Sequence, residues 1–125
     1  MAKFMSDEYV AQVQTALTAD PKWAETAKSL KTSIAMNVTD TGQNYLLGVE
    51  NGTTTFQKSA PGAAAEFTLD GPYDSWCKLG RGEVDIQSAV LKGQLKFKGS
   101  LTKALMYRDK LTKVAEVMRT VPTEF

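Results

Sequence analysis

The spacing of apolar residues divides the first thirty positions of the chain into two helices. Apolar residues recur there every three or four positions, which is the period of one face of an α-helix. Ser6 precedes the first run, and its hydroxyl can accept a hydrogen bond from a free N–H group of the first helical turn. Asp20 precedes the second run, and Pro21 suits a first helical position because its missing N–H would have no partner there. We therefore expect one helix after Ser6 and a second from Pro21.

From Ser33 the apolar period changes to two, which is the period of a strand with one buried face. The alternating residues predict four strands, at 33–38, 45–49, 53–58 and 65–69. Asn51-Gly52 separates the second of these strands from the third, and both residues tolerate the positive φ angles of a type I′ turn. The sequence therefore predicts a hairpin at this turn.

The second half of the chain returns to helices and adds one more strand. Short helices are expected to open at Pro72 and at Asp85. Residues 94–98 alternate again, with a glycine on each side at Gly93 and Gly99, and predict a fifth strand. Two helices separate this strand from the fourth, so the fifth strand need not pair with the strand before it.

The longest helical pattern predicts a single last helix from Ser100 to Met118. Its apolar stripe consists of Ala104, Tyr107, Leu111, Val114 and Met118, widened by Leu101 and Leu105. A sheet with one apolar face must be covered, and helices are the only cover that this chain offers. We therefore expect an α+β fold: a single layer of about five mostly antiparallel strands, covered on one face by about five helices.

Composition is that of one ordinary globular domain, which we place at residues 1–125. The chain has 125 residues and a mass of 13.7 kDa, with 42% apolar and 23% charged residues. No apolar run approaches the roughly 18 residues that a membrane-spanning helix needs. No secretory signal and no Ser-Lys-Leu peroxisomal address is recognisable, which favours a cytoplasmic protein.

The reactive side chains exclude several kinds of catalysis. The chain has no histidine and one cysteine, Cys77, so Cys–His and Ser–His–Asp chemistry and most zinc sites are excluded. Gly80-Arg81-Gly82 lacks the glycine pattern and lysine of a phosphate-binding loop and indicates a turn. Four neighbouring carboxylates match no calcium loop in their spacing: Asp70, Asp74, Glu83 and Asp85. We expect no enzyme activity, no cofactor and no metal.

A set of residues in the second half resembles the signature of the sterol carrier protein type-two family. The motif reads, in order, Gln87-Ser88-Ala89, Gly93, Leu95-Lys96 and Gly99. Upstream elements fit as well: a strand with Phe67, Thr68 and Leu69, a helix with Trp76 and Leu79, and the turn Gly80-Arg81-Gly82. The resemblance is best between Ala63 and Tyr107. It implies a non-catalytic intracellular protein that binds and transfers a lipid, such as a fatty acid, an acyl-CoA or a sterol. The alternative is an accessory or dimerisation module that presents a hydrophobic substrate to a partner enzyme.

The space between sheet and helices has two interpretations. Periodicity alone is equally compatible with a filled core and with an open space, whereas the resemblance implies a hydrophobic tunnel. The residues expected to line this tunnel are apolar and come from strands and helices on either side: Phe67, Leu69, Trp76, Leu79, Ile86, Val90, Leu95, Phe97, Leu105, Leu111, Val114 and Met118. The last helix, joined to the fifth strand through Gly99, is expected to act as a movable lid.

Positive charge gathers in the last third of the chain. Residues 92–125 hold eight Lys or Arg and three Asp or Glu, whereas residues 1–91 hold seven and eleven. Lys103, Lys110 and Lys113 are either the solvated side of the last helix or a basic face that contacts anionic lipid headgroups. Nucleic acid is not an expected partner, because no aromatic residues interleave with these lysines.

Overall fold

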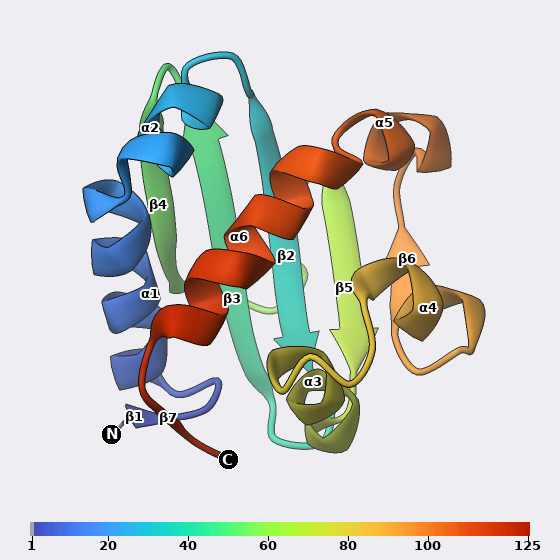
Figure 1. The fold of residues 1–125 in the computed structure, drawn as a ribbon. Helices are drawn as coiled ribbons and strands as arrows, with labels where there is room; N and C mark the ends of the chain where they lie inside the picture. Colours follow the sequence, from blue (N-terminus) through green and yellow to red (C-terminus); the bar gives the residue numbers. More distant parts are fainter. Residues whose placement is uncertain (1) are drawn as a thin grey trace.

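Five strands form one mixed sheet in the computed structural model, which describes residues 2–125 (Figure 1). The strands are β2 (Thr32–Val38), β3 (Gln43–Glu50), β4 (Thr53–Lys58), β5 (Phe67–Gly71) and β6 (Lys96–Lys98). They lie in the order β4-β3-β2-β5-β6, and all neighbours are antiparallel except β2 and β5. The predicted sheet of about five mostly antiparallel strands is confirmed. β6 pairs with β5, so the fifth strand is the neighbour of the fourth despite the two intervening helices.

Local sequence explains the register of the sheet. The turn between β3 and β4 has Asn51 at φ 52° and Gly52 at φ 79°, as the type I′ prediction requires. Ile34 at the centre of the sheet lies between Leu47 of β3 and Phe67 of β5. All three are buried, so this face of the sheet is apolar across its three central strands.

Six helices accompany the sheet within residues 2–125. They are α1 (Asp7–Ala19), α2 (Pro21–Ala27), α3 (Tyr73–Gly80), α4 (Ile86–Leu91), α5 (Leu101–Met106) and α6 (Arg108–Thr120). The predicted cap at Ser6 is present, since its Oγ accepts from the Tyr9 N–H at 3.2 Å. At the predicted start of α2, the Asp20 carboxylate also accepts from the Trp23 N–H at 2.9 Å. Figure 1 shows α1 beside β4 and α6 crossing the apolar face over β3 and β2.

The single last helix predicted for Ser100–Met118 is wrong, because the chain leaves the helical conformation at Tyr107. Tyr107 has φ −93° and ψ 3°, which ends α5 and lets α6 begin in a new direction. The two helices differ in how many of their residues are buried in the core. Val114 and Val117 of α6 are buried, whereas α5 has no buried residue. The break therefore separates a helix that belongs to the core from one that lies on the surface.

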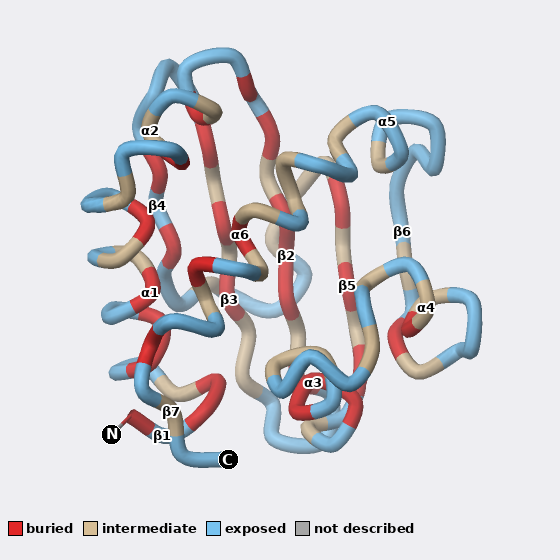
Figure 2. Tube along the Cα trace, in the orientation of Figure 1, coloured by how far each residue is buried: buried red, intermediate tan, exposed pale blue. Residues whose placement is uncertain are grey.

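The buried residues concentrate between the sheet and the helices α1 and α6 (Figure 2). On the opposite face the connection between β4 and β5 passes behind the sheet. Two further strands, β1 (Ala2–Lys3) and β7 (Thr123–Glu124), form a short parallel pair at the two ends of the chain. Within residues 2–125, none of the helices has the length and apolar character needed to cross a bilayer.

Candidate functional site

Most of the predicted lining residues come together in one apolar cluster. Those that are buried are Phe67, Leu69, Trp76, Leu95 and Val114. Those that are half-buried and packed against the core are Leu79, Ile86, Val90, Phe97, Leu111 and Met118. Leu105 is the exception: it lies on α5 and is 59% exposed. The structure thus brings eleven of the twelve residues into contact with one core, and leaves Leu105 on the surface.

An aromatic corner closes this cluster at the start of α6. The ring of Phe67 on β5 lies 5.8 Å from the ring of Phe97 on β6 and 6.2 Å from the ring of Tyr107, measured between centroids. The Tyr107 ring meets Phe67 edge-on, at an interplanar angle of 86°, which is a favoured aromatic arrangement. Tyr107 was expected as one residue of a helical stripe. Its position at the helix break is what makes it a contact between α6 and the sheet.

Trp76 has a structural anchor that the sequence did not indicate. Its indole N–H donates a hydrogen bond of 3.0 Å to the carbonyl oxygen of Asn37 at the end of β2. A buried indole N–H needs such a partner. Trp76 therefore fastens α3 to the end of the sheet and forms one wall of the cluster.

Two clefts open elsewhere on the molecule. The larger, of about 700 Å³, lies at the end of the sheet where β2 begins and β3 ends. Its lining includes Thr32, Ser33, Glu66, Lys103 and Tyr107. A second cleft of about 350 Å³ lies between residues 82–92 and Arg119. The residues that line these two clefts are largely polar and include none of the twelve predicted lining residues, which lie instead in or beside the apolar cluster.

A polar contact at the larger cleft ties α5 to the sheet. Glu66 accepts a hydrogen bond of 2.6 Å from the Thr32 hydroxyl, and its second oxygen lies 3.2 Å from Lys103 Nζ. The Thr32 hydroxyl, and after it the Lys103 ammonium, lower the pKa of Glu66. α5 has no fully buried residue, and this ion pair, the half-buried Ala104 and the neighbouring Tyr107 ring connect it to the rest of the fold.

The Glu66 contact predicts a small pH dependence. A carboxyl whose pKa is lowered by folding stabilises the fold above its unfolded pKa and loses that contribution as the pH falls through its folded pKa. We expect Glu66→Gln to remove at most about 1 kcal/mol of stability at neutral pH, since the pair is partly exposed. The variant should also flatten the loss of stability between about pH 5 and pH 3. Urea unfolding across this range measures both effects. Glu50→Gln, which removes a more exposed pair with Lys31, is the control, and an equal flattening there would contradict the prediction.

The three lysines singled out by the charge pattern are engaged within the molecule. Lys103 pairs with Glu66, and Lys113 Nζ lies 3.7 Å from Glu116 with only 28% of its side chain exposed. Lys110 Nζ lies 3.5 Å from the Ser29 hydroxyl and above the Tyr107 ring. Lys103 lies on α5, whereas Lys110 and Lys113 lie on α6. A contact of these lysines with anionic lipid headgroups stays a prediction.

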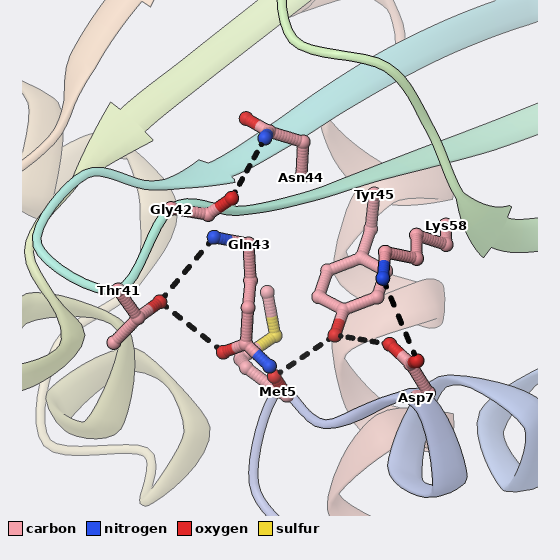
Figure 3. A network of polar contacts seen from close by, with 8 residues as sticks. All are labelled: Met5, Asp7, Thr41, Gly42, Gln43, Asn44, Tyr45 and Lys58. Carbon is pink, nitrogen blue, oxygen red and sulfur yellow. Dashed lines mark hydrogen bonds and ion pairs between the residues drawn. The ribbon is translucent and has the colours of Figure 1, made fainter.

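The buried hydroxyl of Tyr45 has two hydrogen-bond partners at the start of α1. The Tyr45 hydroxyl lies 2.9 Å from Asp7 Oδ1 and 3.2 Å from the Met5 carbonyl oxygen, and Lys58 approaches Asp7 at 3.9 Å (Figure 3). Burial, together with the Asp7 carboxylate, raises the pKa of Tyr45. The phenol therefore stays neutral and fastens the start of α1 to β3.

The thiol of Cys77 and the carboxylates of Asp85 and Asp70 are also accounted for by the fold. Cys77 is buried, and burial raises the pKa of its thiol, which makes the nucleophilic thiolate scarce. Asp85 caps α4 by accepting from the Ser88 N–H at 2.7 Å. Asp70 accepts a hydrogen bond of 2.6 Å from the Asn37 amide. Among residues 2–125, no three His, Cys, Asp or Glu side chains are grouped so that they could hold a metal ion.

Comparison with known proteins agrees with this arrangement. A model of the SCP-2 sterol transfer family matches residues 12–112. A crystal structure of sterol carrier protein 2 is similar at a TM-score of 0.83 and 18% identity, and the match covers 96% of this chain and 100% of that one. A search of curated protein sequences found no match.

Two other solved structures share the fold at lower scores. The solution structure of sterol carrier protein 2 from Aedes aegypti, in complex with the C16 fatty acid palmitate, has a TM-score of 0.58 at 20% identity, covering 86% of this chain and 94% of that one. A ubiquinone synthesis protein, UbiJ-SCP2, has a TM-score of 0.61 at 17% identity, covering 87% and 90%. At such identities the likeness concerns the fold alone.

Proposed function

The chain belongs to the SCP-2 sterol transfer family, and on that premise we propose that it reversibly holds one long-chain apolar ligand between its sheet and its helices. The observation that carries the proposal is the apolar cluster to which β5, β6, α3, α4 and α6 contribute. Six of the predicted lining residues there are only half-buried, so their apolar surface is not fully used by the fold. We propose all of the predicted lining except Leu105 as the ligand-binding residues, in a tunnel that a ligand holds open.

Hydrophobic burial alone supplies enough affinity for such a site. A sixteen-carbon chain gains roughly 12 kcal/mol at about 0.8 kcal/mol per methylene, before association costs of several kcal/mol. Micromolar binding requires only about −8 kcal/mol. No dedicated polar residue is needed, so the ligand class is wide: fatty acids, acyl-CoA, sterols and similar lipids.

The proposed function is carriage without catalysis. The chain has no histidine, and its one thiol and its core tyrosine Tyr45 are buried groups with raised pKa values. The cytoplasm is our proposed location, because a single buried cysteine without a disulfide suits a reducing compartment. Fractionation of the host's cells would check the location.

A second candidate is an accessory module that presents a hydrophobic substrate to a partner enzyme. The similarity in fold to a ubiquinone synthesis protein is the observation that supports this alternative. Deletion of the gene would distinguish the two. An accessory module predicts the loss of one enzymatic step on an apolar substrate, whereas a carrier predicts altered lipid distribution with every enzyme still active.

Titration with a fluorescent fatty acid tests the main proposal. We expect saturable binding of one ligand per chain with a Kd near or below about 1 μM, and displacement by palmitate. Native mass spectrometry of protein purified from its own host, followed by lipid extraction, would identify the natural ligand. If no lipid of several classes binds saturably below about 100 μM, which corresponds to only about −5.5 kcal/mol, the proposal is wrong.

A further inference from the structure

Large apolar side chains gather on the surface at one side of the molecule. Of the five large hydrophobic residues that are exposed among residues 2–125, four lie between positions 91 and 106. They are Leu91 at 79%, Leu101 at 64%, Leu105 at 59% and Met106 at 71% exposure. Single exposed apolar residues are ordinary, whereas a concentration in one short segment indicates a contact surface.

The same segment is strongly basic. Residues 92–108 contain five Lys or Arg and no Asp or Glu: Lys92, Lys96, Lys98, Lys103 and Arg108. Lys98 and Lys103 have acidic neighbours, Asp70 at 4.0 Å and Glu66 at 3.2 Å. Lys92, Lys96 and Arg108 form no ion pair within residues 2–125. We call these four apolar and five basic residues the β6-edge patch.

The fold places this patch at an open margin of the molecule. β6 is the last strand of the sheet, with no strand beyond it. Figure 1 shows α4 and α5 on the same side of the molecule, joined by β6, and Figure 2 shows α5 and the turn after α4 largely exposed. Exposed leucine and methionine flanked by lysine and arginine are the composition of a segment that lies in a membrane interface.

We propose that the β6-edge patch docks on the surface of an anionic lipid bilayer, and that lipid passes between bilayer and protein there. The passage of lipid at this surface rests on the proposed carrier function, whereas the docking of the patch on a bilayer does not. Phe97 of β6 and Tyr107 at the end of α5 connect the patch to the aromatic corner of the apolar cluster. A lipid that left the bilayer at α5 would reach the proposed site without crossing the polar face of the sheet.

Other surfaces and occupants fit less well. A second copy of the chain would bring the same five basic residues against each other in a symmetric contact, and like charges repel. The amphipathic helix α1 contains no basic residue and begins with Asp7 and Glu8, so its exposed side is repelled by anionic headgroups. An acidic protein partner matches the charge, and the vesicle test described next distinguishes it from a bilayer.

Vesicle flotation with the full chain tests the inference. We expect binding to vesicles of equimolar phosphatidylcholine and phosphatidylglycerol, little binding to pure phosphatidylcholine, and release as salt rises. Lys92→Gln/Lys96→Gln/Arg108→Gln should weaken binding about 100-fold, since each basic residue contributes about a factor of five at an anionic surface. Leu101→Gln/Met106→Gln should lower the binding that remains at high salt. All of these side chains are exposed, so the fold should be unaffected.

A matched charge control and a ligand titration make the outcomes separable. Lys3→Gln/Lys22→Gln/Lys78→Gln removes three unpaired charges from other surfaces and should leave flotation within about twofold of the native protein. Full binding by the patch variant, or equal binding to both vesicle types, overturns the inference; no binding to either assigns the patch to an acidic protein instead. Fatty acid titration without vesicles should be the same for the native protein and the patch variants. If the native protein floats with anionic vesicles but binds no fatty acid, the proposed function fails and the docking surface stands.

Discussion

Replacing Gly99 with alanine is expected to destabilise the fold by roughly 3 kcal/mol or more. Gly99 has φ 133°, a conformation that residues with a side chain rarely adopt. A Cβ atom there would lie 2.7 Å from the carbonyl oxygen of Glu66 and 2.9 Å from a ring carbon of Phe67. The first of these atoms belongs to the backbone and cannot turn aside. Thermal or urea unfolding of the purified variant measures the loss.

Gly93→Ala is the matched control for this substitution. Gly93 also has a positive φ, 74°, but a Cβ atom there meets nothing within 4 Å. Only the backbone strain remains, and we expect a loss of about 1 kcal/mol. Equal losses in the two variants would mean that the close approach of Gly99 to β5 is unimportant. Both glycines belong to the signature found in the sequence. The structure requires Gly99 for its φ angle and its close approach to β5, and Gly93 for its φ angle alone.

Replacing Leu111 with tryptophan is expected to weaken fatty acid binding at least about tenfold. Leu111 is half-buried on α6, one turn from Tyr107 and one turn from the buried Val114, so a larger side chain would fill space beside the apolar cluster. Excluding two methylenes of a ligand from contact costs about 1.6 kcal/mol, or a factor of about fifteen. Titration with the fluorescent fatty acid measures the change.

The neighbouring exposed residue provides the control for this variant. Thr112→Trp adds a comparable volume on the outside of the same helix and should leave the affinity unchanged. Overpacking at Leu111 can itself cost about 1–3 kcal/mol of stability, so unfolding is measured alongside binding. Unchanged affinity in a folded Leu111→Trp protein would place the ligand away from α6.

The sequence was sufficient to predict those elements whose signals are local. Ser6 and Asp20 mark helix starts through hydrogen bonds to nearby N–H groups, and Asn51-Gly52 marks a turn through its own φ angles. The alternating strands were equally clear. The same alternation predicted the apolar cluster, because apolar residues on the inner faces of β5 and β6 must pack against the helices that cover the sheet.

Features that depend on contacts between distant residues could not be predicted from the sequence. The stripe of the last helix continues from Ala104 to Met118 without interruption, since one non-helical residue at Tyr107 barely disturbs the spacing, and no glycine or proline marks the break. Leu105 fits the stripe and is nevertheless 59% exposed, because the helix breaks at Tyr107 and α5 no longer continues the buried face of α6. The contact of Lys110 with Ser29 likewise became visible only once α6 was placed, whereas Glu116 lies three residues from Lys113 on the same helix.

The pairing of β1 with β7 determines where a label or a fused protein can be attached. It brings the two ends of the chain together, where the tilted rings of Phe4 and Phe125 pack with their centroids 4.8 Å apart. In Figure 1 these ends lie at the lower left, across the molecule from α5 at the upper right. A fluorophore or a fused protein at either terminus would therefore point into the water while α5 rests on a bilayer. Both ends can carry a label without obstructing the docked face, and the height of such a label above the membrane would report the orientation of the protein.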